Sequence, residues 1–194
     1  MADEIQGVQF GVLNIAGDVT GAQIGVFNVA RKSDATIGVL SLVTEGRTTL
    51  HGFAGSDGVI SLAVQHGSRL VHNYYGGAVS VAGKEGFAFG PTIGIGVHAY
   101  EGAHSFVDID ALAHVLFSSK VNGDLQTLWQ GRAVVGWRLL PSFALYAGPF
   151  YDALHVPTGH APRAYDGAIL GRTVATGGGT LHLSPGLVVG VRGL

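Results

Sequence analysis

Hydrophobic and polar residues alternate with a period of two between His104 and Leu139. This period is typical of β-strands, whose successive side chains point to opposite faces. In the first half, one face carries Val107, Ile109, Ala111, Ala113, Val115 and Phe117, and the other includes Asp108, Asp110 and His114. In the second half, one face includes Trp129, Ala133, Val135 and Trp137, and the other includes Gln126, Gln130, Arg132 and Arg138. The segment is therefore predicted to be one long β-hairpin.

The predicted turn of this hairpin keeps like faces together. A three-residue loop, Val121-Asn122-Gly123, does so, whereas a two-residue Asn-Gly loop would set apolar residues opposite charges. The resulting register pairs Lys120 with Asp124, Val115 with Trp129 and Val107 with Trp137. It also places Asp110 and Asp108 diagonal to Arg132 and Arg138, so that opposite charges meet on one face.

The two tryptophans suggest which solvent meets the apolar face. Trp129 and Trp137 are eight residues apart, which spans about 20 Å across a bilayer for a strand tilted by ~40°. Aromatic girdles of membrane barrels flank an apolar band about 25 Å tall. We therefore expect lipid on the apolar face and the ion pairs inside a barrel. The alternative is a soluble barrel in which the apolar face covers a core and the charges face water.

Composition supports the membrane interpretation. Glycine accounts for 32 of 194 residues and charged residues for only 12%. No segment is long and apolar enough for a transmembrane helix, so a chain of this kind would satisfy its backbone in lipid as a closed barrel. The absence of cysteine excludes disulfides and thiolate metal sites. The net charge of −2 argues against a nucleic-acid partner. Residues 1–4 are interpreted as the start of a mature chain from which a signal peptide has been removed.

The N-terminal part contains an internal repeat. Residues 7–16 and 21–30 are two good copies, and residues 37–42 are a degenerate third. Phe10 and Val12, Ile24 and Val26, and Ile37 and Val39 form an apolar face, whereas Gln9, Gly11, Gln23, Gly25, Thr36 and Gly38 lie opposite. The period of 14 and then 13 residues fits antiparallel barrel strands with short turns, and equally fits the coils of a β-solenoid. Because three copies are few for a solenoid, antiparallel barrel strands with Gln9 and Gln23 inward are the favoured prediction.

The repeat unit Gly-x-Gln-Ile-Gly-Val-x-Asn-Val-Ala resembles the surface repeat of a family of bacterial outer-membrane proteins. The likeness covers residues 7–43 closely and the remainder loosely. It implies a β-barrel in the outer membrane of a bacterium and export by a signal peptide. It implies no biochemical activity, because members of that family have none established.

Further strands are predicted along the rest of the chain. They cover residues 50–54, 59–65, 70–81, 87–99, 143–153 and 181–191, with His98 and Arg192 among the inward positions. Phe143 and Tyr151 repeat the eight-residue aromatic spacing, and residues 155–180 are predicted to be a long loop. The predicted fold is all-β, a single transmembrane barrel of about 12 strands, with 10 as the alternative. One domain spans residues 1–194, with repeat-derived strands in 5–44 and the others in 48–193.

The candidate functional residues are the inward charges Asp108, Asp110, Arg132 and Arg138, together with His114. They form either a selectivity ring for solutes or, as we favour, an ion-pair network that fills the lumen. The girdle aromatics are Trp129, Trp137, Phe143 and Tyr151. We predict no catalytic residue, cofactor or metal site. In particular, His104 and Ser105 are adjacent and point oppositely, unlike the His and Ser of barrel lipid hydrolases.

The sequence thus predicts a non-catalytic outer-membrane barrel, either a narrow, porin-like passive channel or a structural surface protein. Its expected partners are the lipid bilayer and lipopolysaccharide, and small solutes if the lumen conducts. The alternatives are a soluble β-barrel or β-solenoid binding module, and a barrel lipid hydrolase.

Overall fold

The computed structural model describes residues 2–81, 87–118, 125–160 and 171–193. These residues form twelve strands in two separate sheets, one with three strands and one with nine. The all-β prediction is confirmed. No helix long and apolar enough to cross a bilayer occurs among the described residues.

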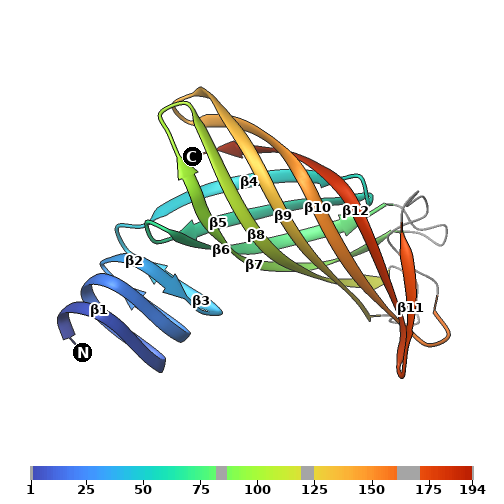
Figure 1. Cartoon of the computed structure of the whole chain (residues 1–194), viewed down its shortest axis with the longest axis horizontal. Helices are drawn as coiled ribbons and strands as arrows, with labels where there is room; N and C mark the ends of the chain where they lie inside the picture. The colour runs from blue at the N-terminus through green and yellow to red at the C-terminus, as the bar shows by residue number, and fades with distance from the viewer. Residues whose placement is uncertain (1, 82–86, 119–124, 161–170, 194) are drawn as a thin grey trace.

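The N-terminal repeats form a parallel β-solenoid, which is the spiral at the left of Figure 1. It consists of β1 (Ala2–Ala30), β2 (Lys32–Ile37) and β3 (Leu40–Val43). The chain pairs with itself in parallel, Asp18 with Lys32 and Phe27 with Leu40, so each coil advances by 13 or 14 residues. The prediction that the repeats are antiparallel strands of the barrel is therefore wrong, and the solenoid alternative is correct.

Polar ladders inside the solenoid explain the repeated residues. Asn14 Nδ2 donates to Asn28 Oδ1 at 2.9 Å, and Asn28 Nδ2 donates to Ser41 Oγ at 3.2 Å. Gln23 Nε2 likewise donates to Gln9 Oε1 at 3.0 Å. Glycine recurs because adjacent coils approach closely: a Cβ atom on Gly25 would collide with the carbonyl oxygen of Gly11. Equivalent residues of successive copies therefore stack directly, which antiparallel strands would not allow.

The other sheet is a closed antiparallel barrel of eight strands. Its strands are β4 (Arg47–Gly55), β5 (Val59–Gly67), β6 (Val71–Ser80), β7 (Ala88–Glu101), β8 (Ser105–Ser118), β9 (Leu125–Leu140), β10 (Phe143–Pro157) and β12 (Gly179–Gly193). Each pairs with the next, and β12 closes the ring by pairing with both β10 and β4. An extra strand, β11 (Arg172–Thr176), pairs with the start of β12 beyond the reach of β4.

The predicted count of 12 barrel strands, and the alternative of 10, are both wrong. The repeats coil outside the barrel and contribute three strands to their own sheet. Within the predicted loop 155–180, the described residues add only β11 and the ends of β10 and β12. An eight-strand barrel is just wide enough for side chains to fill its interior.

The central hairpin keeps its predicted faces but has a different register. Asp110 pairs with Arg132, Ala113 with Trp129 and Ser105 with Trp137. Every pair is displaced by two residues from the prediction, so Asp110 lies directly opposite Arg132 rather than diagonal to it. A two-residue displacement leaves each side chain on its own face, because side chains alternate with period two. The predicted turn at Val121-Asn122-Gly123, and the pair Lys120–Asp124, lie outside the described residues.

We name the two ends of the barrel by what they carry. The solenoid end holds the turns at residues 68–70, 102–104 and 141–142 and the connection from β3 to β4. The loop end holds the turn at residues 56–58 and the start of the chain that links β10 to β11. Figure 1 shows the solenoid beside the barrel at the former end.

Hydrogen bonds attach the solenoid to the outer wall at β5 and β6. Asn73 Nδ2 donates to the Gly38 carbonyl at 2.9 Å, and Tyr75 Oη accepts from the Ser41 amide at 3.2 Å. An ion pair of 2.9 Å joins Arg69, in the turn between β5 and β6, to Asp34 in β2. The contact is therefore specific and mostly polar, and it covers only part of the wall.

Candidate functional site

The barrel interior contains a buried network of charged and polar side chains centred on Asp110. Its Oδ1 lies 2.8 Å from His72 Nε2, and its Oδ2 accepts a hydrogen bond of 2.9 Å from Arg132 Nε. Tyr74 Oη also donates to Oδ2 at 3.3 Å. The side chains of Asp110 and Arg132 are completely inaccessible to solvent. Three strands, β6, β8 and β9, thus converge on one carboxylate.

Asp108 forms a second centre, two residues nearer the solenoid end. Its Oδ1 lies 2.7 Å from His98 Nδ1, and its Oδ2 accepts from Arg192 Nη1 at 3.2 Å. Arg192 comes from the last strand, so this pair links β8 to β12 across the barrel. The rings of His72 and His98 lie 4.3 Å apart and bring the two centres together.

Aromatic rings surround the two buried guanidinium groups. The Arg132 Cζ atom lies 4.2 Å from the Phe53 ring centre and 5.2 Å from that of Tyr74. The Arg192 Cζ atom lies 4.3 Å from the Phe106 ring centre. Cation–π attraction is strongest where water is excluded. The arginines are therefore held by a carboxylate on one side and by aromatic faces on the other.

The predicted inward residues differ in their environment. Asp108, Asp110, Arg132 and His114 are all buried within the barrel. His114 lies further along β8 than Asp108 and Asp110, and its Nδ1 atom is 2.8 Å from Thr92 Oγ1. It therefore has a partner other than the two carboxylates. Arg138 lies half-buried at the solenoid end, where it bonds Glu101 and the Gly102 carbonyl rather than Asp108.

The principal partners missing from the predicted site are His72, Tyr74, Phe53 and Arg192. The alternation along β7 and β12 does place His98 and Arg192 inward, but nothing local shows that both meet Asp108. The partners are separated by up to 84 residues in sequence. Only closure of the barrel brings them together.

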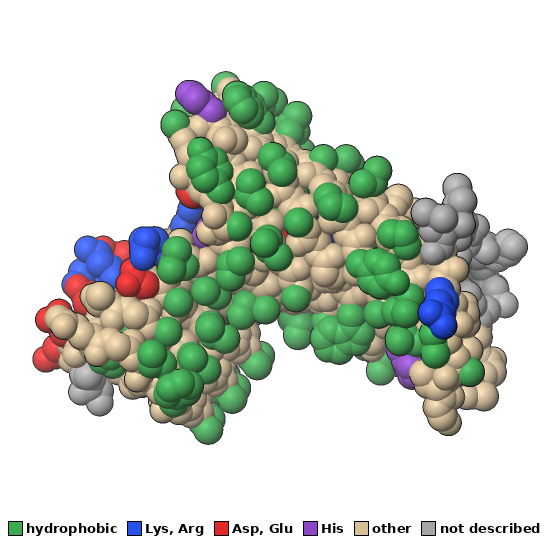
Figure 2. Space-filling view, in the orientation of Figure 1, with side chains coloured by type: hydrophobic (Ala, Val, Ile, Leu, Met, Phe, Trp, Pro, Cys, Tyr) green, Lys and Arg blue, Asp and Glu red, His purple; other side chains and the backbone are tan. Residues whose placement is uncertain are grey.

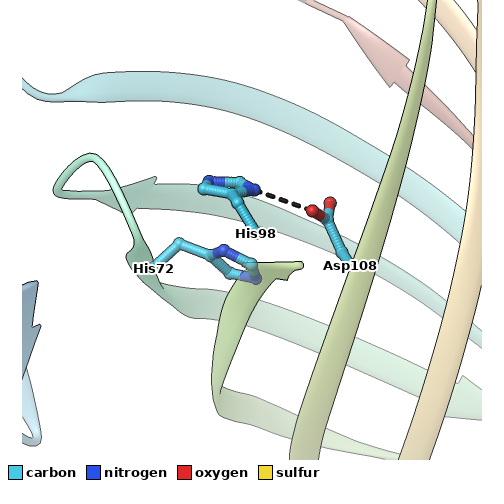
Figure 3. A group of neighbouring side chains, drawn as sticks. All are labelled: His72, His98 and Asp108. Carbon is cyan, nitrogen blue, oxygen red and sulfur yellow. Dashed lines mark hydrogen bonds and ion pairs between the residues drawn. The ribbon is translucent and has the colours of Figure 1, made fainter. Parts of the chain in front are cut away.

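His72, His98 and Asp108 have the composition of a metal site (Figure 3). One ligand atom from each lies within 4.8 Å of the others. However, Asp108 is paired with Arg192 and the neighbouring Asp110 with Arg132. A divalent cation would add two positive charges where the carboxylates are already neutralised, and would compete with both guanidinium groups. The arrangement fits a structural ion-pair network better than a metal centre.

Large side chains occupy the remaining interior. One buried cluster, including Phe53, Tyr74, Phe106, Tyr146 and Phe150, lies around the charged network. A second lies toward the loop end and consists of Val59, Ala78, Ala88, Leu116, Leu128, Leu154 and Val156. Inward glycines make room for the rings, since a Cβ on Gly136 would collide with Phe106 and one on Gly190 with Tyr146. Side chains therefore fill the barrel in the part that the structure describes.

The outer surface of the barrel is apolar (Figure 2). Residues from neighbouring strands, such as Leu62, Ile93, Ile109, Val135 and Val189, each expose half or more of their area. Exposed aromatic residues lie toward both ends of this surface. Tyr100, Trp137 and Phe143 are near the solenoid end, and Phe89, Phe117, Trp129 and Tyr151 are toward the loop end.

Comparison with known proteins adds no relative. No protein-family model, curated protein or solved structure matches this chain.

Proposed function

We propose that this protein is a structural β-barrel of a bacterial outer membrane, without catalysis and with an interior closed by side chains. The observation that carries this proposal is the inverted distribution of polarity. Arg132, Asp110, Asp108 and Gln126 are buried inside, whereas the side chains that point outward are large and apolar. A soluble barrel has the opposite arrangement. A membrane barrel requires this one, because its outer wall meets hydrocarbon.

The two groups of exposed aromatic residues support the same proposal. Trp129 and Trp137 lie near opposite ends of β9 and are 58% and 59% exposed. Indole rings favour membrane interfaces, where the ring contacts hydrocarbon and the N–H group reaches water or headgroups. In this arrangement the bilayer is the main partner, and lipopolysaccharide is the partner in the outer leaflet.

A structural role is preferred to a passive channel because of the filled interior. Phe106, Leu116, Leu128 and Leu154 have no solvent-accessible area. The Asp108–Arg192 ion pair cross-links β8 to β12, and the Asp110–His72 contact cross-links β8 to β6. The likeness of the repeats to those of bacterial surface-repeat proteins fits this role and specifies no chemistry.

The proposal is tested by purification and electrophoresis. We expect the protein to need detergent, to insert into phospholipid vesicles and to migrate faster in SDS before boiling than after it. Closed barrels resist SDS because no strand edge is free to start unfolding. A monodisperse folded protein in detergent-free buffer that does not associate with vesicles would overturn the membrane assignment.

Planar-bilayer recording tests the closed interior separately. We expect no stepwise conductance from the inserted protein. Reproducible single-channel steps would show that the protein is a narrow passive channel, and would leave the membrane assignment intact.

A further inference from the structure

The repeat solenoid has the same inverted polarity as the barrel. Its interior holds polar side chains, of which Gln23, Asn28, Thr36 and Ser41 have no accessible area, beside a small apolar cluster of Ala16, Val19 and Ala30. Its outward side chains on the opposite face are apolar. They stack in columns, with Val8, Phe10 and Val12 in the first coil, Val26 in the second, and Ile37 and Val39 in the third. A solenoid surrounded only by water would bury its apolar side chains and expose its polar ones.

These apolar side chains are strongly exposed. Phe10 exposes 73% of its area, Val12 71% and Val39 65%. The bonds to the barrel include the backbone of Gly38, Val39 and Ser41 and the side chain of Asp34, so they do not use the side chains of the columns. A contiguous apolar patch of this kind usually marks a surface that binds a partner or a membrane.

An apolar groove of about 590 Å³ separates this face from the barrel wall. Val12, Val26 and Val39 line one side of it, and Ile93, Ala113 and Trp129 line the other. The second set belongs to the outer surface that we assign to lipid. The groove therefore opens directly onto the proposed hydrocarbon belt, and whatever covers that belt also reaches the solenoid.

Charged residues gather at a different edge of the solenoid. Arg31 is paired with Asp18 and lies 2.8 Å from Glu45, and Lys32 lies 3.2 Å from Glu45. Figure 2 shows these charges along the upper edge of the solenoid and apolar side chains over its lower part. The solenoid is thus amphipathic, with one side suited to hydrocarbon and one to water.

We propose that the repeat solenoid is itself a membrane-binding element. Its apolar columns lie in the hydrocarbon beside the barrel wall, and lipid acyl chains occupy the groove between the solenoid and that wall. The charged edge stays at the aqueous surface, as in proteins that lie in the membrane interface. This inference rests on the proposed membrane location of the barrel, and it adds a second, monotopic contact beside the transmembrane one.

Lipid fits this surface better than a second protein does. The groove is continuous with Ile93, Ala113 and Trp129, so a protein partner would have to extend into the lipid belt to fill it. Phospholipid chains already reach that belt and adapt to an irregular apolar cleft. A second copy of the chain is the alternative occupant that the experiment must separate from lipid.

Single-cysteine variants test the inference, because the chain has no native cysteine. We would attach a nitroxide at Val12→Cys on the apolar columns, at Lys32→Cys on the charged edge and at Ile93→Cys on the barrel wall. Each labelled protein would be inserted into phosphatidylcholine–phosphatidylglycerol vesicles. Oxygen accumulates in hydrocarbon and a nickel chelate in water, so the ratio of the two relaxation effects reports the solvent at each label.

We expect the oxygen-to-nickel ratio at Val12 to be close to that at Ile93 and well above that at Lys32. A bimane label at Val39→Cys should also be quenched by lipids brominated on their acyl chains. The unboiled mobility in SDS would confirm that each variant retains the folded barrel.

The other outcomes are distinct. If Ile93 lies in lipid while Val12 resembles Lys32, the inference is overturned and the proposed function stands. If Ile93 itself is exposed to the nickel chelate, the membrane location fails, and the inference fails with it. Dipolar broadening between Val12 labels on different molecules, without quenching at Val39, would identify a second copy as the occupant and overturn the inference.

Discussion

At the scale of single residues, Asp110 and Arg132 are two charged residues that are removed completely from water. Both side chains are fully buried, and their Oδ2 and Nε atoms lie 2.9 Å apart. Burial makes the pair a weak source of net stability, since removal of each charge from water is costly. Removal of only one partner is strongly destabilising, because it leaves the other charge buried and uncompensated.

We therefore expect Asp110→Asn to destabilise the folded protein by about 3–5 kcal/mol, as measured by denaturant unfolding in detergent or lipid. The exposed pair Asp34–Arg69 is the matched control, and Asp34→Asn should cost at most about 1 kcal/mol. The double variant Asp110→Asn with Arg132→Met should recover part of the loss. Equal effects of the two single variants would contradict the assigned burial.

At the scale of elements, the solenoid depends on side-chain ladders between coils. Asn28 accepts from Asn14 and donates to Ser41 and to the Ile37 carbonyl, so one side chain joins all three coils. The exposed ion pairs at the charged edge, by contrast, connect coils through water-accessible groups. The two kinds of contact should respond differently to substitution and to pH.

Replacement of the central ladder residue, Asn28→Ala, should destabilise the solenoid by about 1–3 kcal/mol, because Asn14 loses a buried acceptor. Amide hydrogen exchange would detect this as faster exchange in β1–β3. The exposed Gln6→Ala is the control and should leave exchange unchanged. Comparable loss of protection throughout β4–β12 would show that the barrel cannot fold without an intact solenoid.

Glu45 makes the charged edge sensitive to acid. Its hydrogen bond with Arg31, and then that with Lys32, lowers the pKa of this carboxyl from its ordinary value of 4.5. A group whose pKa is lowered by folding stabilises the fold above its unfolded pKa, and the contribution is lost as pH falls through the folded pKa. Protection of the β1–β2 amides should therefore decrease below pH 4.5.

Titration of the Glu45 carboxyl by NMR would check this directly. Arg31→Gln should move the pKa of Glu45 back toward its ordinary value. An unchanged midpoint in that variant would mean that the Arg31–Glu45 contact does not persist in solution.

At the scale of the whole molecule, the polarity of both sheets is inverted. Polar and charged side chains are buried inside the barrel and the solenoid together with apolar clusters, whereas apolar side chains point outward from each. In the proposed membrane location, any charge added to the middle of the barrel's outer wall would have to enter the bilayer.

Ala133, opposite Ile109 on the outer wall between Trp129 and Trp137, tests this consequence. Ala133→Arg should reduce the free energy of folding into bilayers by about 2–4 kcal/mol, whereas a substitution near the interface should cost about 0–1 kcal/mol. Ser142→Arg, in the exposed turn at the solenoid end, is the matched control. Equal, small effects at both positions would indicate that water, not lipid, surrounds the wall.

The sequence by itself determined which side chains share a face. Alternation with period two is local, so Asp108, Asp110, Arg132, Trp129 and Trp137 all lie on their predicted sides of the wall. The tertiary structure alone decided which strands pair. A period of 13 or 14 residues fits a strand with a turn as well as a coil, and the Asn14–Asn28 ladder becomes visible only when the coils stack in parallel.

The same distinction holds for the buried network. Closure of the eight strands brings His72, His98 and Arg192 to the two carboxylates. No local sequence pattern determines the register of β12 against β4 and β10. Register between distant strands depends on how all the interior side chains fit into one ring. The face on which each side chain lies is therefore predictable from the sequence. The residues that it contacts across the barrel are decided only by the closed fold.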